Sequence, residues 1–264
     1  MRTSISSLQK IHQNGEKFTV LTCYDATFSH VLEACGVDVL LVGDSLGNVI
    51  QGEETTLSVT LEQIIYHTRC VARGAKKAFI MTDMPFGTAQ LSPECTFDNA
   101  CQIMAAGAQM VKIEGGRIMT DTIQFLTQRG IPVCAHIGLT PQSIHQLGGY
   151  KIQGNTERSA SRLLSEAKSL EQSGAAMLLM ELVPAPLAKK ITASISIPTI
   201  GIGAGANCTA QVLVLHDMLG LYQDNKAKFV KNFMTESCNI QDAIRNYVKA
   251  VKTGQFPDKT HEYP

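Results

Sequence analysis

Four short apolar segments of this chain are each followed at once by ionisable residues. The segments are residues 39–42, 79–81, 110–111 and 177–180, and the residues that follow them are Asp44, Asp83, Lys112, Glu114 and Glu181. An ionised side chain at the end of a buried strand costs free energy unless it is paired or bound to a cation. We therefore expect these side chains to meet in one site, assembled from the ends of several strands.

Carboxylates follow three successive apolar segments, as Asp44, Asp83 and Glu114. Carboxylates gathered in one place repel each other unless a cation lies among them, and a site with only oxygen ligands suits Mg²⁺ or a similar hard divalent ion. The alternative is that each carboxylate caps the following helix or pairs with a surface lysine. Their recurrence on three adjacent strands favours the metal site.

Three further residues have types that suit proton transfer or anion binding. Lys112 lies two residues from Glu114, so both side chains point to the same face of one strand, where the ammonium group could bind a substrate carboxylate or form a salt bridge. His136, after residues 132–135, could donate a hydrogen bond to a ligand oxygen or serve a structural role. Glu181 follows an apolar segment that would keep its carboxyl group basic enough to accept a proton from carbon.

The elements that would position these residues alternate regularly between strand and helix. Strands are expected at residues 18–22, 37–42, 78–82, 109–113, 132–135, 176–180, 199–202 and 212–215, and helices at 26–35, 60–72, 96–106, 117–128 and 157–172. Unbroken apolar segments without alternation are typical of parallel strands covered on both faces. We therefore predict an α/β fold, a single (β/α)₈ TIM barrel over residues 1–264, with a helical segment at about residues 227–253.

In such a barrel the carboxyl ends of the strands face a common mouth, where catalytic groups come from several strands. The glycine-rich run Gly201–Gly205 ends the seventh expected strand. A run of this kind can hold phosphate on its backbone, or it can let the backbone turn sharply or approach a ligand. The sequence leaves these alternatives open.

Composition favours a small-molecule partner. Lys+Arg and Asp+Glu are both 23, and no basic tract suggests binding to nucleic acid or to an anionic membrane. The first residues lack the apolar core of a signal peptide and no apolar run approaches membrane-spanning length, so a cytoplasmic location is expected. The eight cysteines form no C-x-x-C pair and are expected to be buried thiols: Cys23, Cys35, Cys70, Cys95, Cys101, Cys134, Cys208 and Cys238.

Several motifs, taken together and in order, resemble the 3-methyl-2-oxobutanoate hydroxymethyltransferase (ketopantoate hydroxymethyltransferase) family. They are residues 43–48, 83–86, 111–116, 136–142, 148–154, Glu181 with Val183-Pro184, and 201–205. The resemblance covers nearly the whole chain and implies a barrel of the phosphoenolpyruvate/pyruvate superfamily type. It further implies Mg²⁺ dependence and hydroxymethyl transfer from 5,10-methylenetetrahydrofolate to 3-methyl-2-oxobutanoate through an enolate, the first step of pantothenate synthesis.

The resemblance also assigns residues to roles. It implies metal-site carboxylates at Asp44, Asp83 and Glu114, oxoacid binding by Ser45 and Lys112, and Glu181 as the proton acceptor. We include His136, Asp44 and Asp83 in the expected substrate site. A homo-oligomer is implied too, since the family commonly forms decamers.

One departure and two alternatives accompany this resemblance. Residues 208–211 read Cys-Thr-Ala-Gln where the family usually has Cys-Asp-Gly-Gln; Ala210 loses the access to positive φ that glycine has, which leaves the conformation of the local loop open. The chain could instead be another Mg-dependent oxoacid carbon–carbon lyase of the same superfamily, but those families usually carry a Lys-Lys-Cys-Gly-type motif that is absent here. A non-catalytic barrel is the other alternative, and the complete acid/base set argues against it.

Overall fold

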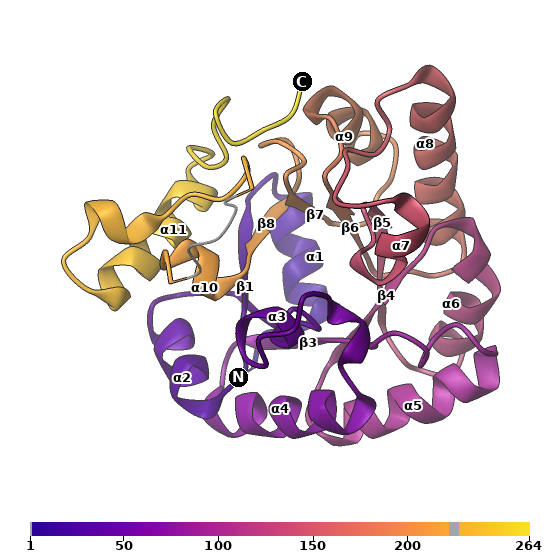
Figure 1. Ribbon diagram of the computed structural model, residues 1–264, viewed down its shortest axis with the longest axis horizontal. Coiled ribbons are helices and arrows are strands. Elements are labelled where there is room, and N and C mark those ends of the chain that lie inside the picture. Colours follow the sequence, from indigo (N-terminus) through magenta and orange to yellow (C-terminus); the bar gives the residue numbers. More distant parts are fainter. Residues whose placement is uncertain (1, 222–226) are drawn as a thin grey trace.

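Eight parallel strands form a closed barrel in which β1 to β8 follow one another in sequence order (Figure 1). The computed structural model describes residues 2–221 and 227–264. The strands are β1 (Phe18–Thr22), β2 (Val39–Val42), β3 (Phe79–Asp83), β4 (Met110–Glu114), β5 (Val133–Gly138), β6 (Met177–Glu181), β7 (Thr199–Ile202) and β8 (Ala210–Leu213). Each overlaps a predicted strand, and the predicted TIM-barrel fold is confirmed.

Helices surround the barrel and connect its strands (Figure 1). They are α1 (Ile5–Gln13), α2 (Ala26–Ala34), α3 (Leu46–Val49), α4 (Leu61–Gly74), α5 (Pro93–Ala105), α6 (Thr120–Thr127), α7 (Ile144–Leu147), α8 (Glu157–Gln172), α9 (Ala185–Thr192), α10 (Leu215–Met218) and α11 (Ile240–Lys252). Several begin at side-chain caps: Thr60 and Gln63 form a capping box at α4, and Asp25 accepts a hydrogen bond from the Phe28 N–H at α2.

The alternation of side chains along each strand divides the core into two layers. In β3, Phe79 and Met81 point into the barrel interior, whereas Ile80 packs under the surrounding helices. The same period of two carries the side chain of Asp83 into the interior, at the end of the strand. Inward-facing Met81 and Leu179 likewise precede Asp83 and Glu181 by two positions, and in β4 inward-facing Met110 is followed at the same spacing by Lys112 and then Glu114.

Helix α1 closes the amino-terminal end of the barrel. Leu8 is fully buried and packs with Phe18 and Val39, which stand near the beginnings of their strands. His12 Nδ1 lies 2.9 Å from Thr209 Oγ1, just before β8. The opposite end of the barrel, where the strands finish, is therefore the open one.

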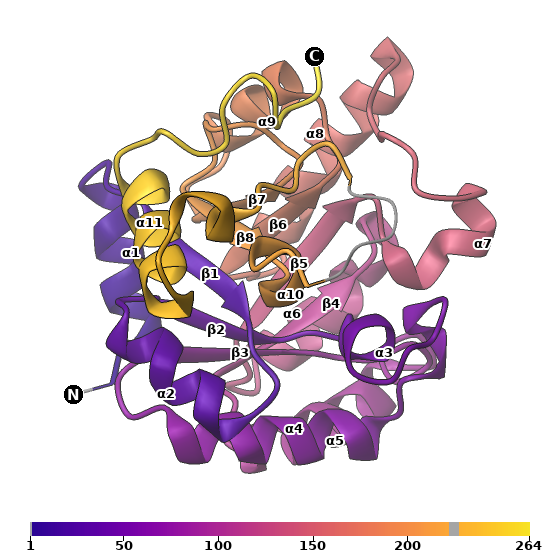
Figure 2. The same cartoon turned by 60° about the vertical axis from the view of Figure 1, so that its left-hand side comes forward.

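The eighth helical position is filled by α11, which lies along the outer side of β1 (Figure 2). Tyr247 of this helix is buried, and its hydroxyl lies 3.0 Å from Val20 O and 2.8 Å from Gln211 O. Within the predicted helical segment of about residues 227–253, the helical elements are a 3₁₀ turn at Phe233–Glu236 and α11 itself. No helix in the described residues is long and apolar enough to cross a membrane.

One prediction drawn from the sequence, the burial of all eight cysteines, was wrong in part. The prediction of buried thiols holds for Cys23, Cys35, Cys134 and Cys208, but Cys70 is half-buried and Cys95, Cys101 and Cys238 are exposed. Cys95 and Cys101 belong to α5, whose buried face consists of Thr96, Ala100 and Ile103. The question left open at Ala210 is answered by its position: it is the first residue of β8 and does not have a positive φ, which among the described non-glycine residues occurs at Leu182.

Candidate active site

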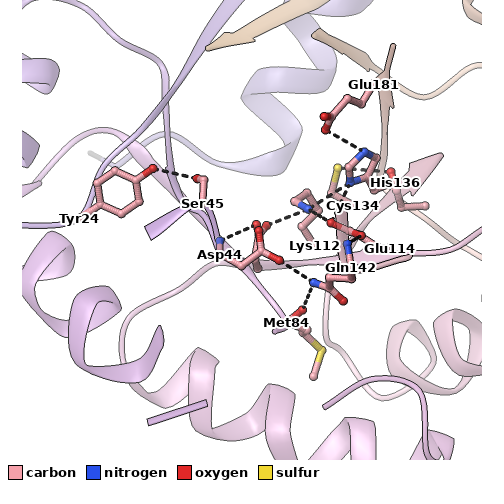
Figure 3. A network of polar contacts seen from close by, with 12 residues as sticks. Tyr24, Asp44, Ser45, Met84, Lys112, Glu114, Cys134, His136, Gln142 and Glu181 are labelled. Atoms are coloured by element: carbon pink, nitrogen blue, oxygen red, sulfur yellow. Dashed lines mark hydrogen bonds and ion pairs between the residues drawn. The ribbon is translucent and has the colours of Figure 1, made fainter. Parts of the chain in front are cut away.

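The charged residues at the strand ends meet at the open end of the barrel (Figure 3). Strand pairing places Asp83 beside Lys112, and Glu114 beside His136. Glu181 ends β6 and Asp44 follows β2. These side chains come from five consecutive strands, and all of them line one cavity.

The cavity has a volume of about 160 Å³ and two kinds of wall. The charged residues form one wall, while Leu179, Ile202 and Val212 of the barrel interior line another. Ser45 also lines the cavity, and its Oγ lies 2.8 Å from the Tyr24 hydroxyl. A small anion with an apolar portion would match both walls.

Asp83 connects its neighbours on both sides. Its Oδ1 lies 3.1 Å from Lys112 Nζ, and its Oδ2 accepts a 3.0 Å hydrogen bond from the Asp44 N–H. Burial, followed by the charges of Asp83 and Glu114, raises the pKa of Asp44 well above its usual range. Burial alone would lower the pKa of Lys112, but the surrounding carboxylates outweigh it and hold that pKa above its ordinary value. Lys112 is therefore a permanent ammonium ion.

His136 lies between Lys112 and Glu181. Its Nδ1 is 3.2 Å from Lys112 Nζ, and its Nε2 is 3.5 Å from Glu181 Oε2. Burial and the charge of Lys112 lower the pKa of His136, which favours the neutral imidazole. An ammonium group can only donate, so Nδ1 is the acceptor and the imidazole proton resides on Nε2, facing Glu181.

The two glutamates of the site have opposite electrostatic character. Burial would raise the pKa of Glu114, but the charge of Lys112, whose Nζ lies 3.7 Å from Glu114 Oε1, and the hydrogen bond from the Gln142 N–H lower it overall. Burial, and then the charge of Glu114, raises the pKa of Glu181 to about 8. Glu114 is thus held as a carboxylate, whereas Glu181 can gain and release a proton near neutral pH.

The backbone around Glu181 is closely constrained. Leu182 has φ of 48°, a left-handed conformation that costs a leucine free energy and that marks functional sites in many proteins. Gly138 has φ of 91°, and a Cβ added there would overlap the carbonyl oxygen of Glu181. That same oxygen accepts a 2.8 Å hydrogen bond from the Leu139 N–H. Because residue 138 is a glycine, the end of β5 can approach β6 closely enough for this hydrogen bond to hold the backbone of Glu181 in place.

The glycine-rich run Gly201–Gly205 is used for close packing. A Cβ at Gly201 would meet Cys208, and one at Gly205 would meet Ala185. The Gly205 carbonyl also accepts a 3.0 Å hydrogen bond from Gln211 Nε2. These contacts support the alternative in which the glycines permit a sharp turn and a close approach of chain segments.

Sequence reasoning did not single out Tyr24 or Gln142, although both contact residues of the site. Gln142 belongs to one of the motifs noted above, and its Nε2 donates a 2.8 Å hydrogen bond to Asp44 Oδ2. Spacing gives no sign of this contact, because Gln142 lies in a loop that folds back over the strand ends. Tyr24 likewise reaches Ser45 only through the conformation of the segment after β1.

The donor set fits a Mg²⁺ ion held by few protein ligands. No three Asp, Glu, His or Cys side chains in residues 2–221 and 227–264 are arranged to bind one ion as they stand. Mg²⁺, however, is usually held by one or two carboxylates, with substrate and water oxygens completing the octahedron. The buried Glu114 Oε1 has no hydrogen-bond donor among the described residues, and Asp83 Oδ1 is paired with Lys112 Nζ at 3.1 Å. Within residues 2–221 and 227–264, Lys112 is the one ammonium ion beside Asp44, Asp83 and Glu114, so this part of the site retains negative charge that a cation would balance.

Comparison with known proteins gives consistent results. The family model described as ketopantoate hydroxymethyltransferase matches residues 2–259. A 3-methyl-2-oxobutanoate hydroxymethyltransferase of Nitrosospira multiformis is 65% identical over 263 residues and covers 100% of both chains. The protein of that name from Nitrosomonas europaea is 61% identical over 262 residues, covering 99% of this chain and 97% of its own.

Solved structures show a related fold at low sequence identity. A 2,3-dimethylmalate lyase, a member of the PEP mutase/isocitrate lyase superfamily, has a TM-score of 0.60 at 16% identity, covering 95% of this chain and 99% of its own. A phosphonopyruvate hydrolase has a TM-score of 0.64 at 12% identity, covering 83% of this chain and 84% of its own. These likenesses show that the chain shares the barrel fold of these two proteins.

Proposed function

This chain belongs to the ketopantoate hydroxymethyltransferase family, and from that premise we propose that it transfers a hydroxymethyl group from 5,10-methylenetetrahydrofolate to 3-methyl-2-oxobutanoate. The product would be 2-dehydropantoate, in the first step of pantothenate synthesis. The observation that carries the chemical part of this proposal is that Lys112, His136 and Glu181 line one cavity in series, with His136 Nε2 3.5 Å from Glu181 Oε2, while burial raises the pKa of Glu181 to about 8.

Lys112 and Ser45 are the proposed binding groups for the oxoacid. Lys112 provides a buried positive charge in a cavity of about 160 Å³, which suits a small carboxylate. The Ser45 hydroxyl can donate to a substrate oxygen while it accepts from the Tyr24 hydroxyl at 2.8 Å. The apolar wall of Leu179, Ile202 and Val212 would contact the branched alkyl group.

Glu181 is the proposed base that removes the C3 proton. A carboxylate of this basicity accepts a proton more readily than an ordinary one, and the Nε2–H of His136, 3.5 Å away, can keep its Oε2 oriented. Asp44 and Asp83 would hold Mg²⁺, with Glu114 acting directly or through water. When bound there, the ion would supply positive charge to the 2-oxo oxygen and the carboxylate of the oxoacid.

The overall conversion consumes one water molecule. The C3–H bond breaks with its proton transferred to Glu181, and a C3–carbon bond forms to the one-carbon unit of the donor. The two carbon–nitrogen bonds of the donor's methylene group break, water supplies the hydroxyl oxygen and its hydrogen, and the second water proton together with the C3 proton taken up by Glu181 protonates the two nitrogens of the departing tetrahydrofolate. The proposal thus accounts for every atom of the hydroxymethyl group.

The test is deuterium exchange at C3 of 3-methyl-2-oxobutanoate in D₂O, followed by NMR without any folate. We expect Mg²⁺-dependent exchange, and formation of 2-dehydropantoate only when 5,10-methylenetetrahydrofolate is added. Exchange without product formation in the complete mixture would contradict the transferase proposal and favour a superfamily lyase.

We also propose a cytoplasmic homo-oligomer, with a decamer as the form that the family resemblance implies. Light scattering of the purified protein would measure the number of subunits. A monomeric mass would contradict this part of the proposal.

A further inference from the structure

Gln142 joins two carboxylates that come from different strands. Its side-chain Nε2 donates a 2.8 Å hydrogen bond to Asp44 Oδ2, and its backbone N–H donates a 2.9 Å hydrogen bond to Glu114 Oε2 (Figure 3). Gln142 is only 5% exposed. One buried residue of the β5 loop thereby holds one oxygen of each carboxylate.

The orientation of the Gln142 amide is determined by its surroundings. Nε2 also donates a 2.9 Å hydrogen bond to the carbonyl oxygen of Met84, so both of its hydrogens are used. Oε1 accepts a 3.1 Å hydrogen bond from Gln90 Nε2. The Gln90 amide is itself fixed, because its Oε1 accepts a 2.8 Å hydrogen bond from the Gly87 N–H. This chain of contacts begins at a backbone N–H, so the NH₂ group of Gln142 must face Asp44.

These hydrogen bonds decide which carboxylate oxygens are available to a ligand. Oδ2 is the oxygen of Asp44 that accepts a hydrogen bond within the described structure, which leaves Oδ1 for the cavity that Asp44 lines. Glu114 Oε2 is occupied by the Gln142 N–H, whereas the buried Oε1 has no hydrogen-bond donor among the described residues. Outer contacts of this kind orient metal ligands and strengthen metal binding in many proteins.

We propose that Gln142 is a positioning residue: by binding Asp44 Oδ2 and Glu114 Oε2 it presents their other oxygens to a divalent cation and so determines the affinity of the site. The inference rests on the metal site of the proposed function. Gln90 acts through Gln142, because it fixes the direction of the amide.

The experiment measures Mn²⁺ binding to the full-length apoprotein, by the EPR signal of free Mn²⁺, without substrates. Gln142→Met keeps the length of the side chain and removes its polar groups, while the backbone N–H contact to Glu114 remains. We expect the Mn²⁺ dissociation constant to rise about 10-fold to 100-fold. Gln90→Ala, at an exposed position, should raise it by a smaller factor.

Gln211→Met is the matched control. Gln211 is 2% exposed and donates a 3.0 Å hydrogen bond to the Gly205 carbonyl, so its replacement also removes a buried amide, but away from the carboxylates. We expect it to bind Mn²⁺ as the wild type does. A thermal melt of each variant shows whether Gln142→Met and Gln211→Met lose the same amount of stability.

The outcomes separate the inference from the proposed function. If the wild type does not bind Mn²⁺, the metal site itself is wrong, and the inference falls with it. If the wild type binds and Gln142→Met binds equally well, or if Gln211→Met weakens binding to the same extent, only the inference is overturned. Should Gln142→Met fail to fold, Gln90→Ala decides: an unchanged dissociation constant would overturn the role of Gln142.

Discussion

Replacing Glu181 by Gln tests the proposed proton acceptor with the smallest possible change. Glutamine keeps the size and polarity of the side chain that lies 3.5 Å from His136 Nε2, but it does not take up a proton near neutral pH. Loss of a positioned base typically costs about 10²-fold to 10⁴-fold in rate. We therefore expect C3 exchange without folate to fall by about that factor, while the oxoacid still binds.

The pH dependence of the C3 exchange rate gives a second, independent test of Glu181 with an expected size. Only the ionised form of Glu181 can accept the proton, so the exchange rate should rise with pH through the pKa of about 8. With that pKa, roughly one carboxyl group in eleven is ionised at pH 7 and about ten in eleven at pH 9, which predicts an increase of about 10-fold. A bound divalent cation favours the carboxylate and would move this rise to lower pH.

The assay is NMR of the C3 proton in D₂O, with Glu166→Gln as the control. Glu166 is another partly buried glutamate whose pKa is raised by burial, and it does not line the cavity. Its variant should exchange as the wild type does. If Glu181→Gln exchanges near the wild-type rate and keeps the rise with pH, another group is the base, and His136 becomes the first candidate.

Three further predictions concern the metal, the oxoacid and the backbone. Asp83→Ala should abolish Mg²⁺-dependent activity in a folded protein; insensitivity of the wild-type enzyme to a chelator would contradict the metal assignment. Lys112→Ala should raise KM for the oxoacid more than KM for the folate, whereas equal changes would indicate a structural salt bridge. Gly138→Ala should lower the free energy of unfolding by about 1–3 kcal/mol more than Gly52→Ala does. Both glycines have positive φ, but only a Cβ at position 138 would overlap the Glu181 carbonyl oxygen. Equal losses of stability in denaturant melts of the two variants would refute this steric argument.

The sequence predicted the strands and their charged ends because both depend on local pattern. Each charged residue lies just beyond an apolar segment, and side-chain alternation alone carries Lys112 and Glu114 into the barrel interior. The contacts of Gln142 and Tyr24 could not be predicted in this way, since each depends on how a loop folds back over strands distant in sequence.

Helix α1 was also absent from the prediction, for a related reason. It precedes the first strand and so lies outside the alternation of strand and helix, although Ile5, Leu8 and Ile11 share one apolar face. Its place is determined by the opening at the base of the barrel, which exists only after the eight strands have closed.

The closure of the barrel base by α1 has a kinetic consequence. With that end blocked by Leu8, the two proposed substrates share one entrance. The oxoacid, held by the buried Lys112, would lie beneath the one-carbon donor, and neither could pass the other. The enzyme would then follow a compulsory order, in which the oxoacid binds first and tetrahydrofolate dissociates before 2-dehydropantoate. Excess folate would bind above the product and slow its release.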